Sequence, residues 1–139
     1  MRVGIVGSRQ YTDRIKIKNF IFKLKEQYEG SGKLNEGIII VSGGCKNGAD
    51  KFAKKYALEL DINYEEYPPF HDSYNLYCVL PERLYGKPYH VSNYFARNKL
   101  IAKNSDMVVG FIPEGVRSNG TMSTIKYAKS FNKKTLIIM

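Results

Sequence analysis

The stretch that decides the fold is GIIIVSGGCKNGAD, residues 37–50. Residues 38–41 are continuously apolar and β-branched, which is typical of a strand buried on both faces of a parallel sheet. Serine and glycines follow, as expected of a tight turn. A helical pattern of apolar side chains comes next, carried by Phe52, Ala53, Tyr56, Ala57 and Leu60. A strand, a glycine-rich turn and a helix in this order predict a βα unit of an α/β fold.

The same alternation recurs along the rest of the chain. Expected strands lie at residues 3–6, 37–41, 62–67, 107–111 and 135–138, and expected helices at 15–28, 52–60, 93–103 and 121–131. Gly30-Ser31-Gly32 is expected to end the first helix. Because parallel strands are joined by right-handed crossovers, the pattern predicts a Rossmann-like, doubly wound parallel sheet of five strands in the order 3-2-1-4-5, with helices on both faces.

The composition is that of an ordinary globular protein. The chain has 139 residues, 43% hydrophobic and 25% charged, and no apolar run approaches the ~18 residues that span a bilayer. The start of the sequence lacks a secretory pattern, so we expect a cytoplasmic protein with a single domain over residues 1–139. Cys45 and Cys78 lack the spacing of metal ligands, and we expect neither a metal site nor a disulfide framework.

The net charge of +9 attracts phosphates and admits two interpretations. One is a basic groove that binds nucleic acid. The other is a solvated surface, because the lysines are spread along the chain and fall mostly on the outward faces of the expected helices.

Residues 68–92 interrupt the alternation, with prolines, tyrosines, histidines and charged residues in place of a clean period. We expect an inserted loop here. Its aromatic residues either form a lid that closes over a ligand and stacks on a base, or pack the loop onto the domain or against a second copy of the chain. The residues concerned are His71, Tyr74, Tyr77, Tyr85, Tyr89, His90 and Tyr94.

Three glycine-containing loops follow expected strands and precede expected helices, at residues 7–9, 42–50 and 115–121. Glycine permits close approach of the backbone, and free amides at a helix start attract anions. Because the carboxyl ends of parallel strands meet at one edge of a sheet, we expect one phosphate-binding crevice. The candidate ligand-binding residues are Gly7, Ser8, Arg9, Ser42, Gly43, Gly44, Lys46, Asp50, Arg97, Asn98, Ser118, Gly120 and Thr121, with Arg117 as a further source of charge.

None of the loops matches GxGxxG or GxxxxGK[ST], so a standard NAD site or ATP hydrolase is not favoured and no cofactor is expected. The chain does combine the following segments in one order: Val6-Gly7-Ser8-Arg9, Val41-Ser42-Gly43-Gly44 with Gly48-Ala49-Asp50, Ala96-Arg97-Asn98-Lys99-Leu100-Ile101-Ala102 with Ser105-Asp106, and Gly120-Thr121. This combination resembles the SLOG superfamily, which includes the Rossmann domain of DNA-processing protein A, the LOG nucleotide phosphoribohydrolases and small YspA-like stand-alone domains.

The resemblance implies a cleft for a nucleotide or nucleotide-derived small molecule, which is our first expectation, and it leaves a homodimer open. Similarity to DNA-processing protein A implies, as an alternative, binding of single-stranded DNA or RNA. Similarity to the LOG hydrolases implies cleavage of an N-glycosidic bond by an acidic residue after a Gly-Thr pair. Here Met122 follows Gly120-Thr121, and only Asp50 and Glu114 are available as substitutes. A binding domain is therefore favoured over an enzyme.

Overall fold

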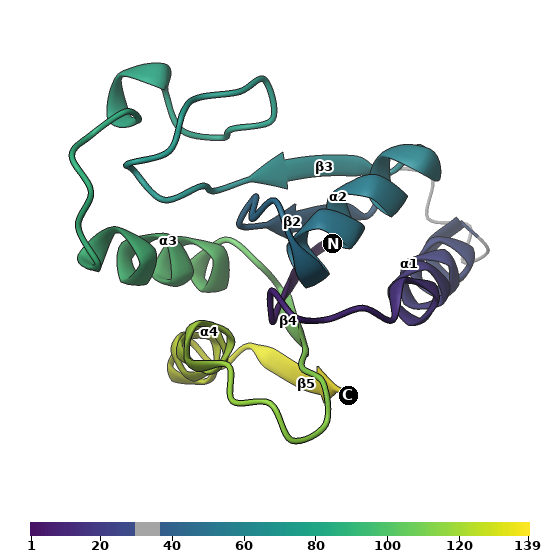
Figure 1. The fold of residues 1–139 in the computed structure, drawn as a ribbon. Helices are drawn as coiled ribbons and strands as arrows, with labels where there is room; N and C mark the ends of the chain where they lie inside the picture. The colour runs from purple at the N-terminus through teal and green to yellow at the C-terminus, as the bar shows by residue number, and fades with distance from the viewer. Residues whose placement is uncertain (30–36) are drawn as a thin grey trace.

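The chain folds around a five-stranded parallel sheet in a computed structural model that describes residues 1–29 and 37–139 (Figure 1). The strands run in the order β3-β2-β1-β4-β5, and every adjacent pair is parallel. This confirms the predicted fold. The expected end of the first helix at residues 30–32 lies outside the described residues. The strand bounds are β1 Arg2–Gly7, β2 Ile39–Ser42, β3 Asn63–Glu66, β4 Met107–Phe111 and β5 Lys134–Ile138.

The helices cover both faces of the sheet. They are α1 (Arg14–Glu29), α2 (Gly48–Glu59), α3 (Ser92–Lys103) and α4 (Asn119–Ser130). One apolar core joins α1 and α2 to the sheet through residues such as Ile5, Ile21 and Ala53. A second joins α3 and α4 to the opposite face through residues such as Ile101 and Ile125. Within the described residues, no helix has both the length and the hydropathy to cross a membrane.

The connection between β3 and α3 leaves the end of the sheet and returns to it (Figure 1). It contains one short 3-10 helix, Glu82–Leu84. Its first part is anchored to the edge strand, because the Glu66 amide donates to the Tyr77 carbonyl at 3.0 Å and the Val79 amide donates to the Glu66 carbonyl at 3.3 Å. A single parallel bridge, between Glu66 and Cys78, therefore holds the inserted loop against the end of β3.

Candidate functional site

A cavity of about 540 Å³ lies between the loop after β1, the loop after β2, one side of α3 and the start of α4. Parallel α/β sheets place their ligand sites at this edge, outside the carboxyl ends of the strands. The structure brings most of the predicted site residues together in its lining: Gly7, Ser8, Arg9, Gly43, Asp50, Arg97, Asn98, Ser118, Gly120 and Thr121, with Arg117 beside them.

The remaining predicted residues lie elsewhere. Gly44 and Lys46 line a neighbouring cavity of about 570 Å³. Ser42 is fully buried beneath the loop, outside the lining of both cavities. Its hydroxyl donates to the Ile5 carbonyl at 2.7 Å, so its role in the structure is to join β2 to β1.

The glycines of the first two loops pack against protein rather than open space. A Cβ added at Gly7 would lie 2.4 Å from the Phe111 carbonyl oxygen, and one added at Gly48 would lie 2.2 Å from the Ser8 carbonyl oxygen. Amides in these loops are also occupied: Ser8 donates to Phe111 at 3.0 Å, and Ala49 at the start of α2 donates to Ser8 at 3.2 Å. These contacts pack the β1–α1 loop against the start of α2.

The start of α4 is different, because its first amides are unused. Within residues 1–29 and 37–139, the amides of Asn119, Gly120 and Thr121 donate to no protein acceptor. A Cβ added at Gly120 would meet no atom within 4 Å. The Ser118 and Thr121 hydroxyls lie 2.6 Å apart and are hydrogen-bonded to each other, so one of the two can still donate to a ligand. Free amides and the helix dipole make this turn suited to an anion.

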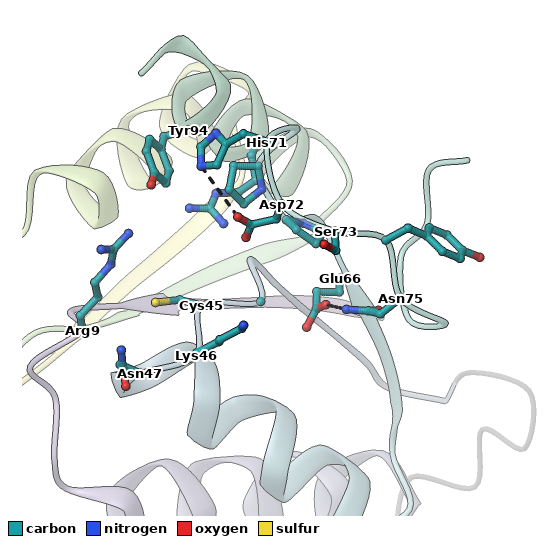
Figure 2. Close-up of a pocket in the computed structure, with 15 residues that line it drawn as sticks. Arg9, Cys45, Lys46, Asn47, Glu66, His71, Asp72, Ser73, Asn75 and Tyr94 are labelled. Atoms are coloured by element: carbon teal, nitrogen blue, oxygen red, sulfur yellow. Dashed lines mark hydrogen bonds and ion pairs between the residues drawn. The ribbon is translucent and has the colours of Figure 1, made fainter. Parts of the chain in front are cut away.

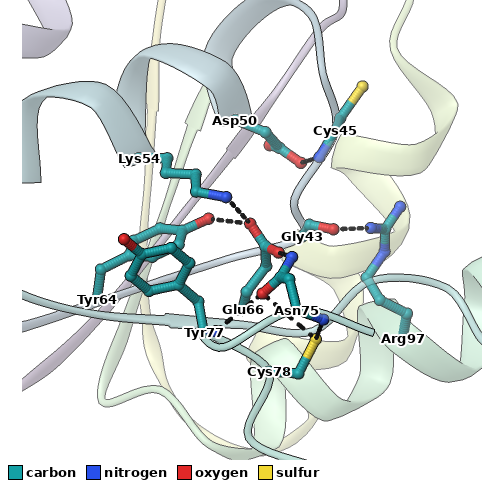
Figure 3. A network of polar contacts seen from close by, with 10 residues as sticks. All are labelled: Gly43, Cys45, Asp50, Lys54, Tyr64, Glu66, Asn75, Tyr77, Cys78 and Arg97. Atoms are coloured by element: carbon teal, nitrogen blue, oxygen red, sulfur yellow. Dashed lines mark hydrogen bonds and ion pairs between the residues drawn. The ribbon is translucent and has the colours of Figure 1, made fainter. Parts of the chain in front are cut away.

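Arg97 and Asn98 of α3 join the β2–α2 loop to the start of α4 beside the cavity. The Arg97 Nη1 donates to the Gly43 carbonyl at 2.7 Å (Figure 3). Its Nε donates to the Asn98 Oδ1 at 3.0 Å. The Asn98 Nδ2 reaches the Gly120 carbonyl at 3.4 Å. This pair fixes the position of α3 relative to the β2–α2 loop and the start of α4, and it holds the Arg97 charge at the cavity.

Asp50, in the first turn of α2, is 7% exposed and its Oδ2 accepts the Cys45 amide at 3.2 Å (Figure 3). Burial raises the pKa of Asp50 above its ordinary value, and the positive charge of Arg97 and the hydrogen bond from Cys45 oppose that shift. Glu114, the other carboxylate considered for hydrolysis, is exposed and outside the lining of both cavities.

Sequence reasoning misplaced one residue that lines the cavities and missed another. Tyr94 was assigned only to the inserted loop, yet it lies on α3, one turn before Arg97, and lines both cavities. The spacing of three residues on a helix would have placed both on one face. Glu66, at the carboxyl end of β3, is 1% exposed and lines the second cavity. The sequence signal that could have identified Glu66 was an acidic residue at the carboxyl end of an expected strand.

The aromatic residues of the insertion divide into two groups. Tyr85 is 7% exposed and contacts Phe70, with ring centroids 6.1 Å apart, so it packs the loop internally. His71 lies 4.8 Å from Tyr89 and 4.9 Å from Tyr94 between ring centroids. These three residues form the second group. They line the cavities, where their rings can contact a ligand.

Comparison with solved structures shows the same fold in proteins of different function. DNA processing protein A from Helicobacter pylori, described for its single-stranded DNA binding mode, is 24% identical with a TM-score of 0.64, covering 99% of this chain and 64% of that one. The chain therefore spans less than two thirds of that protein.

Two further structures of this fold are linked to the molybdenum cofactor. The molybdenum cofactor binding protein from Rippkaea orientalis is 19% identical with a TM-score of 0.68, and coverage is 98% of this chain and 74% of that one. The molybdenum cofactor carrier protein from Chlamydomonas reinhardtii is 18% identical with a TM-score of 0.62, and coverage is again 98% and 74%. No family model and no curated protein matches the chain.

Proposed function

We propose that the chain is a SLOG-type domain that binds a nucleotide or nucleotide-derived, phosphate-bearing ligand in the 540 Å³ cavity. One observation carries the proposal: the unused amides of the first turn of α4 face the same cavity as the Arg9 and Arg97 guanidiniums. Backbone amides at a helix start and arginine forks are two recurring means of holding phosphate in proteins.

In this proposal a phosphate lies against Gly120 and Thr121, with Arg117 beside it. The rest of the ligand extends toward α3, where Val91 and Phe95 give the cavity an apolar wall. Such a division, with a few polar groups against an apolar wall, is typical of small-molecule sites. The Asp50 carboxylate, which also lines the cavity, is suited to accept a hydrogen bond from a sugar hydroxyl.

The structural neighbours support ligand binding as the role of such a domain. Proteins with this fold bind single-stranded DNA or the molybdenum cofactor. The arrangement of loops at the carboxyl edge is compatible with a bound phosphate in this chain as well.

The test is the binding of nucleoside mono-, di- and triphosphates, measured by isothermal titration calorimetry. Arg9→Ala is expected to weaken binding by at least about tenfold, which corresponds to the ~1.4 kcal/mol that a charged hydrogen bond supplies. Lys99→Ala, on the exposed side of α3 and outside both cavities, removes the same charge and is expected to leave affinity unchanged. Equal losses in both variants would show attraction to net charge alone.

A second candidate function is sequence-independent binding of single-stranded DNA or RNA. The net charge of +9 and the similarity to the Helicobacter pylori protein favour it. Neutralising phosphates along a strand releases counterions, so affinity for a strand falls steeply with salt. A steep fall in affinity for an oligonucleotide, with no measurable affinity for mononucleotides, would favour this function over the first.

A further inference from the structure

The second cavity, of about 570 Å³, has Arg9 and Tyr94 in its lining (Figure 2). It lies between the β2–α2 loop and the start of the inserted loop, from Pro68 to Asn75. Arg9, Cys45, Tyr94 and Arg97 line both cavities. The two cavities are therefore neighbours that share one wall.

The shared wall carries two positive charges. The Arg9 and Arg97 Cζ atoms lie 5.9 and 5.8 Å from the centroid of the Tyr94 ring, and hydrogen bonding to the Tyr94 side chain raises the pKa of Arg9. Neither guanidinium takes part in an ion pair within the part of the chain that the structure describes. The junction between the cavities is thus suited to an anion.

The second cavity contains a buried carboxylate whose partners are protein groups. Glu66 accepts hydrogen bonds from Tyr64, at 2.8 Å, and from Asn75, and it lies 3.4 Å from the Lys54 ammonium (Figure 3). The hydrogen bonds from Tyr64 and Asn75 satisfy the Glu66 oxygens, and the Lys54 ammonium compensates the negative charge. The Glu66 carboxylate therefore repels a negatively charged ligand less than an unpaired carboxylate would.

The rest of the second cavity has the mixed character of a site for a flat polar ring. Pro68, Pro69 and Tyr74 give it apolar walls, while Ser73 and Lys46 supply donors. Its volume is close to that of the first cavity. Both lie within the range of ~300–1,000 Å³ that is usual for sites of small organic ligands.

We infer that the two cavities together bind two nucleoside units joined through phosphate, with the linking phosphate at Arg9 and Arg97 and one nucleoside in each cavity. This inference rests on the proposed function, because it keeps the first nucleotide in the cavity at α4. Either a free dinucleotide or one step of a single strand has this chemistry, and the inserted loop supplies the second half of the site.

The experiment compares four probes: AMP, the 3′–5′ dinucleotide pApA, a ten-nucleotide adenine strand and diadenosine diphosphate, in which two adenosines are joined 5′ to 5′. Because a second unit tethered at an adjoining site adds affinity, at least one dinucleotide is expected to bind at least about tenfold more tightly than AMP. Preference for pApA, with a further gain for a ten-nucleotide strand, identifies a strand. Preference for diadenosine diphosphate, or no gain beyond pApA, identifies a free dinucleotide.

A variant that fills only the second cavity separates the two proposals. Ser73→Phe adds an aromatic ring to the wall of the second cavity. The affinity of this variant for dinucleotides is expected to fall to its affinity for AMP, while its affinity for AMP stays within about twofold of wild type. Leu76→Phe, in the same loop but 91% exposed and outside both linings, is the control and is expected to change neither.

Three results overturn the inference. If wild type binds AMP and both dinucleotides equally, or Ser73→Phe weakens AMP and dinucleotides alike, the two-cavity site is wrong while the proposed function stands. If no probe binds, the two-cavity site is wrong, and the proposed function fails with it only when the other nucleoside mono-, di- and triphosphates do not bind either.

Discussion

The Arg97 Nη1 lies 2.7 Å from the Gly43 carbonyl oxygen and donates a hydrogen bond to it. This contact joins α3 to the loop after β2, across a separation of 54 residues in the chain. The guanidinium that we assign to ligand binding is therefore also a structural link between two walls of the cavity.

Arg97→Lys is expected to lower stability as well as affinity. Lysine keeps the charge but cannot donate in the two fixed directions that hold the Gly43 carbonyl and the Asn98 side chain. The loss of one to two such hydrogen bonds predicts a fall of about 1–2 kcal/mol in the free energy of unfolding, measured by urea denaturation. Wild-type stability in this variant would mean that the Gly43 contact contributes nothing to the fold.

Gly7→Ala is expected to destabilise the protein even without ligand. The added methyl group would lie 2.4 Å from the Phe111 carbonyl oxygen and 2.5 Å from the Ala49 Cβ, so backbone must move. Overpacking of this kind costs ~1–3 kcal/mol. Gly37→Ala, where an added Cβ meets no atom within 4 Å, is the matched control, and urea midpoints that fall equally in both variants would contradict the packing explanation.

Asp50→Asn is expected to change how stability depends on pH. Burial raises the pKa of Asp50 above its value of 3.8 in the unfolded chain, so the folded state holds the proton more tightly. Protonation of Asp50 therefore stabilises the folded state. This stabilisation is fully present below the unfolded pKa and is lost as the pH rises through the folded pKa. Asparagine retains an acceptor for the Cys45 amide without this titration.

The stability of Asp50→Asn relative to wild type should therefore increase as the pH is raised from the unfolded pKa of 3.8 through the higher pKa of the folded state. Urea denaturation of both proteins across that range measures the difference. A difference that stays constant with pH, or decreases, would mean that the folded protein does not disfavour the Asp50 carboxylate.

Gly120→Ala separates ligand binding from folding. The added methyl group meets no protein atom, and alanine favours a helix over glycine by up to ~1 kcal/mol, so the melting temperature should hold or rise. A phosphate seated on the Gly120 amide would be obstructed, and nucleotide affinity is expected to fall about tenfold, or ~1.4 kcal/mol. Unchanged affinity would remove Gly120 from the site.

The sequence was sufficient to predict the strand order and the edge of the sheet at which the cavity lies. Alternating buried strands and amphipathic helices leave few arrangements open, and parallel strands gather their carboxyl ends on one side. It was also sufficient to nominate Arg97 and Gly120, which line the cavity.

The sequence could not predict whether each glycine faces a ligand or packs against another part of the protein. Gly7 and Gly48 both follow the expected pattern of a ligand-binding loop, yet the space beside each is filled by another loop or strand. Such contacts join segments distant in the chain and depend on how closely two βα units pack. The wall that the two cavities share at Tyr94 could not be predicted for the same reason, because it forms only where α3 meets the loop after β1.

The most direct test of the central claim is to follow backbone amide resonances by NMR while AMP is added. The account predicts the largest shifts at the start of α4, in Asn119, Gly120 and Thr121, with smaller ones at Arg9 and along α3 near Arg97. Shifts confined to the lysine-bearing outer faces of α1 and α2, with the α4 amides unmoved, would contradict it.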